Sequence, residues 1–79
     1  MTGFYLTFQL VSNAPHVENV HVRDNNLYSG TISYLLKTGK FELYIRNSGK
    51  SQHNSLHQAR QHATKILRQV YEVTNCYNN

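Results

Sequence analysis

The segment LYSGTISYLLKTGKFELYIRN, residues 27–47, decides the fold. Apolar and polar side chains alternate on both sides of the turn-forming pair Thr38-Gly39. Alternation with a period of two is typical of a strand that buries one face. The segment therefore predicts a β-hairpin, with strands over about residues 27–37 and 40–47.

The register of this hairpin follows from which residues can share a face. A two-residue turn at Thr38-Gly39 places all six apolar side chains of the facing rows on one side of the sheet, whereas a three-residue turn buries serine and threonine. We therefore expect the two-residue turn, although it sets Lys37 opposite Lys40. The expected apolar pairs are Leu36 with Phe41, Tyr34 with Leu43, and Ile32 with Ile45.

Two further strands are predicted before the hairpin. Apolar and polar residues alternate from Phe4 to Val11, which indicates a strand over about residues 3–12. Ser12 to Pro15 interrupts the pattern, and a weaker valine pattern predicts a second strand over 16–23. The run Asp24–Asn26 favours a turn, because Asn and Asp tolerate left-handed backbone conformations.

One amphipathic helix follows the sheet. Ser55 and Gln58 have the spacing of a capping box at a helix start. Apolar residues then recur three and four apart, which predicts a helix over about 52–74 with one buried stripe. The stripe consists of Leu56, Ala59, Ala63, Ile66, Leu67, Val70 and Val73. The expected fold is α+β: one domain over 1–79, with an antiparallel sheet of three or four strands (β-β-β-β-α) and a C-terminal helix on one face.

Composition narrows the class of protein. The chain has 79 residues, a net charge of +4 and a predicted isoelectric point of about 9.5, which favours a polyanionic partner. The single cysteine, Cys76, cannot form an internal disulfide, as expected in a reducing compartment. The first residues do not resemble a signal peptide, and no apolar run reaches membrane-spanning length. We therefore expect a cytoplasmic protein with no membrane partner.

Catalytic and metal-binding constellations are weak. The four Asp and Glu residues show no spacing that suggests an acid–base pair, and no phosphate-binding glycine loop occurs. His53 and His57 are four apart, as in some metal sites, but no Cys, Asp or Glu lies nearby. The prediction is therefore a non-enzyme without catalytic residues, metal or cofactor.

Two candidate binding surfaces emerge. On the open sheet face, Tyr5, Tyr44 and Arg46 can stack on bases and contact phosphates, as on sheets that bind RNA and single strands. Tyr and Arg are equally typical of protein–protein hot spots, and tyrosine is also simply a good strand former. The second surface is a collar of basic residues, which consists of Lys37, Lys40, Lys50, Arg60, Lys65 and Arg68.

The functional expectation is a non-catalytic binding module that engages nucleic acid or a nucleoprotein complex. One alternative is an inhibitor or adaptor that docks on one specific protein. In its small size and Asn-rich, weakly charged composition the chain resembles accessory proteins of phages and mobile elements, including anti-CRISPR inhibitors. A second alternative is a homodimer formed through the open sheet face.

Part of the pattern resembles a DNA-binding architecture. Tyr28-x-Gly30, Gly39-Lys40-Phe41, Ile45-Arg46 and an alanine-containing helix are similar in outline to the sheet-plus-helix domains of plant transcription factors and integrase arms. The resemblance covers residues 28–70. It implies that the sheet contacts DNA. The chain departs from that family, which has a further strand before the helix where only residues 47–52 are available here, so the strands would have to be counted differently.

Overall fold

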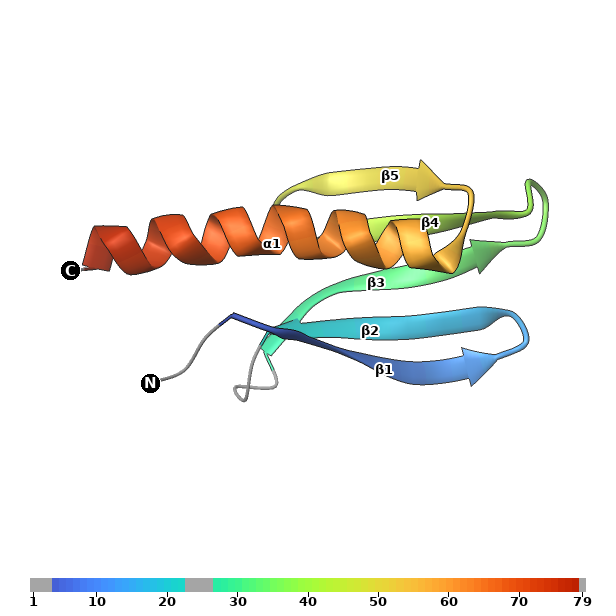
Figure 1. The fold of residues 1–79 in the computed structure, drawn as a ribbon. Helices are drawn as coiled ribbons and strands as arrows, with labels where there is room; N and C mark the ends of the chain where they lie inside the picture. The colour runs from blue at the N-terminus through green and yellow to red at the C-terminus, as the bar shows by residue number, and fades with distance from the viewer. Residues whose placement is uncertain (1–3, 23–26, 79) are drawn as a thin grey trace.

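The hairpin at residues 27–47 lies inside a larger antiparallel sheet that precedes one helix (Figure 1). This computed structural model describes the backbone of residues 4–22 and 27–78 and the side chains of 4–22 and 29–71. The predicted turn at 24–26 and the side chains of Glu72, Val73 and Cys76 lie outside these ranges. The elements are β1 (Leu6–Asn13), β2 (His16–Val22), β3 (Leu27–Leu35), β4 (Lys40–Ile45), β5 (Gly49–His53) and α1 (Leu56–Asn78).

The α+β class is confirmed, but the sheet has five strands where three or four were expected. Each strand pairs antiparallel with the next along the chain, in the order β1-β2-β3-β4-β5. The additional strand, β5, replaces the first part of the predicted helix. Helix α1 therefore begins at Leu56, four residues later than the expected residue 52. No helix among the described residues is long and apolar enough to cross a membrane.

The predicted hairpin register is wrong by two residues. Tyr34 pairs with Phe41 and Ile32 with Leu43, and residues 36–39 form the turn. Gly39 adopts a positive φ of 72°, and its amide donates a hydrogen bond of 2.8 Å to the carbonyl of Leu35. This longer turn removes Lys37 from the strand, so it no longer opposes Lys40.

A shift of two residues leaves each strand residue on its predicted face, because side chains alternate with a period of two. Ile32, Leu43 and Ile45 are accordingly buried under the helix, as expected. Leu36 is the exception. It lies in the turn instead of on the buried face, and 75% of it is exposed.

The predicted helix cap is present. The Ser55 hydroxyl accepts a hydrogen bond from the Gln58 amide at 3.1 Å. The Gln58 side chain reaches back to the amide of Asn54 at 3.2 Å, one residue before the position expected for a capping box. The cap defines where β5 ends and α1 begins.

The core lies between α1 and the central strands. Small residues of the helix, Ala59 and Ala63, allow α1 to approach the sheet closely, and Leu67 extends the contact. Helix α1 packs mainly on β3, β4 and β5, whereas β1 lies at the far edge (Figure 1). The fully buried sheet residues are Val20, Ile32, Leu43 and Ile45.

Gly30 permits the central strands to pair. A Cβ atom at this position would overlap the carbonyl oxygen of Tyr44 on β4. We therefore predict that Gly30→Ala lowers the free energy of unfolding by about 3 kcal/mol, at the upper end of overpacking costs. Gly49→Ala is the control: it meets no atom but sits at a φ of 87°, and it should cost about 1 kcal/mol. Urea denaturation tests this, and equal losses in the two variants would contradict it.

Candidate functional site

The sheet face turned away from α1 is polar. Strand alternation and the observed registers place Val17 and Leu35 on this face, but most of its side chains are polar or charged. These residues are Thr7, Gln9, Asn19, His21, Thr31, Ser33, Lys40, Glu42, Tyr44, Lys50 and Gln52. We call this surface the open face. It offers hydrogen-bond donors and acceptors across all five strands.

Tyr44 occupies the second strand from one edge of the open face. It pairs with Thr31 on β3 and with Lys50 on β5, and its side chain is half-buried. Lys40 begins the same strand, and Arg46 follows it in the turn as an exposed residue. An aromatic ring therefore has a lysine beside it, with basic residues before and after it along the strand.

The structure brings together only part of the predicted binding set. Of the residues predicted for the open face, Tyr44 lies on β4 and Arg46 directly follows it. Lys40, which was predicted for the basic collar, begins the same strand. Tyr5 precedes β1, three strands away from β4, and is 42% exposed. Lys37 lies in the β3–β4 turn. The other predicted residues, Arg60, Lys65 and Arg68, belong to α1, on the opposite side of the sheet from the open face.

Arg60 has a structural partner, Glu18. The Glu18 side chain is only 1% exposed, and the Arg60 guanidinium donates to both carboxylate oxygens at 2.7 Å. The guanidinium also lies over the Phe8 ring, 5.2 Å from its centroid. The planar guanidinium suits both contacts, because it binds a carboxylate through two donors and stacks on aromatic rings.

His16 completes this network. Its Nε2 atom lies 2.8 Å from Oε1 of Glu18. Burial raises the pKa of the Glu18 carboxyl, but hydrogen bonds and charge from Arg60 and His16 outweigh burial and hold the pKa below its ordinary value. A carboxylate kept ionised in this way suits a structural ion pair that joins β2 to α1.

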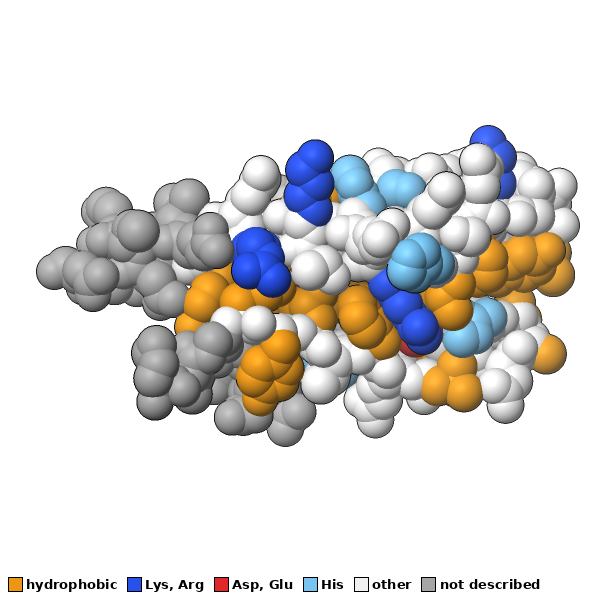
Figure 2. Space-filling view, in the orientation of Figure 1, with side chains coloured by type: hydrophobic (Ala, Val, Ile, Leu, Met, Phe, Trp, Pro, Cys, Tyr) orange, Lys and Arg blue, Asp and Glu red, His pale blue; other side chains and the backbone are white. Residues whose placement is uncertain are grey.

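A second arginine covers another aromatic side chain of the β1 end. The Arg68 guanidinium lies 5.0 Å from the centroid of the Phe4 ring, and Phe4 also contacts Tyr71 with centroids 5.7 Å apart. Figure 2 shows the basic side chains beside the hydrophobic band next to the helix. Two arginines of α1 therefore cover aromatic rings in or next to β1, Arg60 over Phe8 and Arg68 over Phe4.

His53, which lies four residues before His57 in the sequence, contacts a different histidine. The rings of His53 and His62 have centroids 4.8 Å apart, and Nε2 of His53 lies 2.8 Å from the Ser51 hydroxyl. Burial and the neighbouring His62 lower the pKa of His53. Within residues 4–22 and 29–71, no group of three or more His, Cys, Asp or Glu side chains is placed to hold a metal ion.

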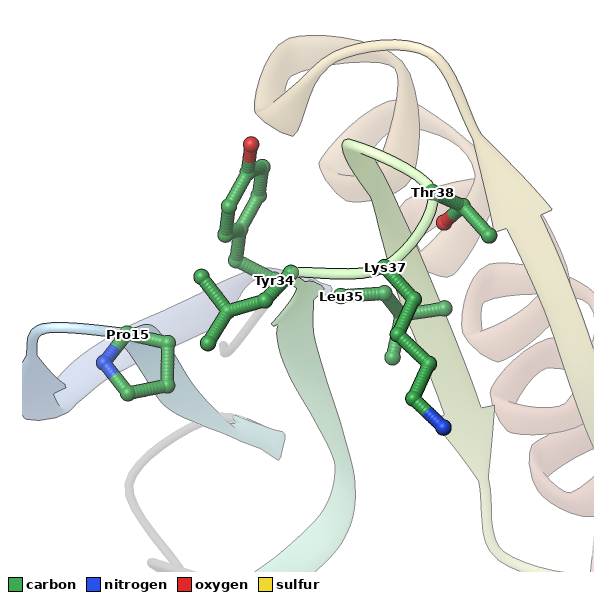
Figure 3. Close-up of a pocket in the computed structure, with 6 residues that line it drawn as sticks. Pro15, Tyr34, Leu35, Lys37 and Thr38 are labelled. Carbon is green, nitrogen blue, oxygen red and sulfur yellow. The ribbon is translucent and has the colours of Figure 1, made fainter.

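The end of the sheet carries an apolar hollow. Pro15 from the β1–β2 turn and Tyr34 and Leu35 of β3 line an open space of about 390 Å³ (Figure 3). Leu36, Lys37 and Thr38 complete its lining. We call this feature the tip pocket. Its combination of an exposed leucine and a lysine follows from the four-residue turn, which sequence patterning did not predict.

The described surface is strongly basic. Seven Lys and Arg side chains stand against two carboxylates, Glu18 and Glu42, within residues 4–22 and 29–71. When Glu18 and Arg60, which pair with each other, are left out of this count, six cations and one carboxylate remain.

Lys50 and Gln52 were not expected on the open face, because β5 has no apolar alternation that would reveal it. All four residues from Lys50 to His53 are polar, so the sequence contains no alternation that signals this strand.

Comparison of the chain with models of protein families, with curated proteins and with solved structures finds no match. The outlined DNA-binding resemblance therefore has no support from relatives. Strand β5 (Gly49–His53) occupies part of the segment before the helix, but it belongs to a five-stranded sheet.

The Glu18–Arg60 pair should affect both the free energy of unfolding and its dependence on pH. Arg60→Met should lower the free energy of unfolding at pH 7 by about 3 kcal/mol, because it leaves a buried carboxylate without its main partner. The matched control, Lys65→Met, changes an exposed residue of the same helix and should stay within about 0.5 kcal/mol.

The pH dependence has a defined sign. The lowered pKa of Glu18 stabilises the wild type above the unfolded-state pKa, and this stability is lost as pH falls through the folded pKa. Without Arg60, burial should raise the pKa of the Glu18 carboxyl instead. As pH falls, the variant is therefore protonated at Glu18 before the wild type, and this removes its unpaired buried charge. The difference between wild type and Arg60→Met should therefore shrink as pH falls below neutrality. Urea unfolding at several pH values measures it, and a constant difference would contradict the role of Glu18.

Proposed function

We propose that the protein is a non-catalytic module that binds single-stranded nucleic acid on its open face. The observation that supports this most directly is the placement of Tyr44 beside Lys50 on that face, with Lys40 and Arg46 near the two ends of β4. Tyrosine rings stack on bases of any sequence, and lysine and arginine contact phosphates.

The shape of the open face favours single strands over a duplex groove. Five strands spaced about 4.8 Å apart form a platform close to 20 Å wide. The major groove of DNA is only about 12 Å wide and admits a two-stranded ribbon, not the whole sheet. Unstacked bases, in contrast, can lie flat on a broad polar surface. The hydroxyl and amide side chains of Thr31 and Asn19, which contact each other at 3.4 Å, add polar groups next to the Tyr44 strand.

The non-catalytic part of the proposal is supported by the state of the carboxylates. Glu18 is enclosed by Arg60 and His16, which leaves it no role as a base. Glu42 is a lone carboxylate on the open face, opposite Ser33 and Gln52. Neither has a second acid or a nucleophile arranged with it among the described contacts.

Binding of a fluorescent oligouridine, followed by anisotropy, tests the proposal. Affinity should fall steeply between about 50 and 200 mM salt, because phosphate contacts release counterions. Tyr44→Ala should weaken binding about tenfold, since one stacked base contributes roughly 1–3 kcal/mol. Lys50→Ala should reduce the salt slope by about one unit.

The control for these variants is Lys65→Ala, which removes the same charge from the helix side. It should leave affinity nearly unchanged. A loss equal to that of Lys50→Ala would show that only net charge matters, and undetectable binding at about 50 mM salt would exclude the function itself.

The tip pocket favours a second candidate function, docking on one specific protein as an inhibitor or adaptor. Exposed Leu36 next to Lys37 offers an apolar contact with a charge at its rim. The complementary ligand is a protein segment with an apolar side chain and a neighbouring carboxylate. Protein hot spots consist of such desolvated apolar contacts within a polar surround.

The two functions are separable by mutation. A partner captured from nuclease-treated lysate through the tip pocket should be lost with Leu36→Asp and retained with Tyr44→Ala. Leu36 is largely exposed, so this change should leave the fold intact, which circular dichroism checks. If Leu36→Asp retains the partner, the tip pocket is not the docking site.

A further inference from the structure

The two edges of the sheet differ in length and character. The edge strand β5 is short, and its five residues are polar and include Lys50. The opposite edge strand, β1, has eight residues with no charged side chain. Leu10 and Val11 of β1 are 50% and 58% exposed. Short length and lysine protect an edge from pairing with another strand, and β1 lacks both.

Strand β1 also carries an apolar row on the helix side. Leu6, Phe8 and Leu10 point to this side, because they pair with Val22, Val20 and Glu18 of β2. Phe8 packs against the core and Arg60, but the row continues outward to the exposed Leu10. Figure 2 shows the hydrophobic band between the helix and the strands at this side of the molecule. Edge backbone and apolar side chains are therefore available along the same strand.

We infer that β1 pairs with β1 of a second copy of this chain and forms a continuous ten-stranded sheet. The regular part of the strand is Leu6–Leu10, because a bulge interrupts the register between Leu10 and Ser12. Antiparallel pairing about Phe8 places Leu6 of each copy opposite Leu10 of the other. The strand is thus self-complementary, as a two-fold interface requires.

Charge favours a second copy as the occupant of this edge. Two chains of net charge +4 repel each other, so a contact that brings no further like charges together is favoured. Residues 4–13 contain no Lys, Arg, His, Asp or Glu. The other edge strand, β5, contains Lys50 and His53.

Symmetry fixes the consequence for the open face. Antiparallel pairing of equivalent edge strands requires a two-fold axis perpendicular to the sheet. Both helices then lie on one side, and the two open faces form one surface on the other. The paired sheet would carry two copies of Tyr44 and its lysines. This inference does not depend on nucleic-acid binding, because the edge of β1 exists whatever the open face binds.

Sedimentation equilibrium over a wide concentration range tests the inference. The mass should rise from 9.2 kDa to twice that value, with a dissociation constant on the order of 10 µM, because a strand-pair contact is at the small end of interface sizes. Leu10→Lys should weaken the dimer at least tenfold. The control Leu36→Lys adds the same charge at an exposed leucine two strands away and should leave it intact.

Hydrogen exchange locates the contact independently of any variant. Amides of Thr7 to Gln9 should become more protected as concentration rises, while those of β5 should not change. A monomer at every concentration, or a dimer that Leu10→Lys leaves unchanged while its circular dichroism is native, would overturn the inference. Tyr44→Ala should abolish stacking on nucleic-acid bases without affecting the dimer. Failure of the proposed nucleic-acid binding can therefore be distinguished from failure of the proposed dimer.

Discussion

One helix cannot cover five strands, and this constraint shapes the whole molecule. A helix with its side chains is about 10–12 Å wide, whereas the sheet spans about 20 Å. Helix α1 packs mainly on β3, β4 and β5, and β1 lies outside its main contact. The side chains that extend from the helix toward this end are Arg60 and Arg68, which lie over Phe8 and Phe4.

The Glu18–Arg60 pair is the link that makes this arrangement specific. A guanidinium that covers an aromatic ring at a partly exposed site contributes only about 0.5–1 kcal/mol. The bidentate contact with a buried carboxylate fixes both the position of Arg60 and the distance between β2 and α1. It also removes one negative charge from the surface. The same pair also engages the charge of Arg60, so it positions the helix and leaves the net charge unchanged.

Sequence patterns predicted the faces of the elements better than their pairing. Ile32, Leu43 and Ile45 are buried as the period-two alternation indicates, because a register shift of two residues preserves every face. The register itself depended on the turn, and the positive φ of Gly39 with its hydrogen bond to Leu35 favours four residues over two. Alternation alone contains no information about that choice.

Strand β5 and the partner of Arg60 were beyond sequence reasoning for different reasons. Gly49–His53 has no large apolar residue, so its pairing with β4 through the backbone leaves no hydrophobic signal. Arg60 looked like an exposed cation of the helix. Only its contact with Glu18, 42 positions earlier in the chain, shows that it is structural. The predicted basic collar consequently separates into Lys40 and Lys50 on the open face, Lys37 in the β3–β4 turn, and a helix group.

The separation of these two groups gives the two sides of the sheet different physical roles. Arginine on the helix side is used largely to complete packing, where charge is matched by Glu18 and aromatic rings. On the open face, Lys40 lies opposite Leu35 and Lys50 lies opposite Tyr44, and Glu42 is the one carboxylate of that face within the described residues. The edge of β1 lies at the side of the sheet, between the helix side and the open face. Extending the sheet at this edge therefore enlarges the open face without disturbing the core. A small domain with limited buried area can in this way present a broad binding surface, since the additional strands come from pairing and not from a larger core.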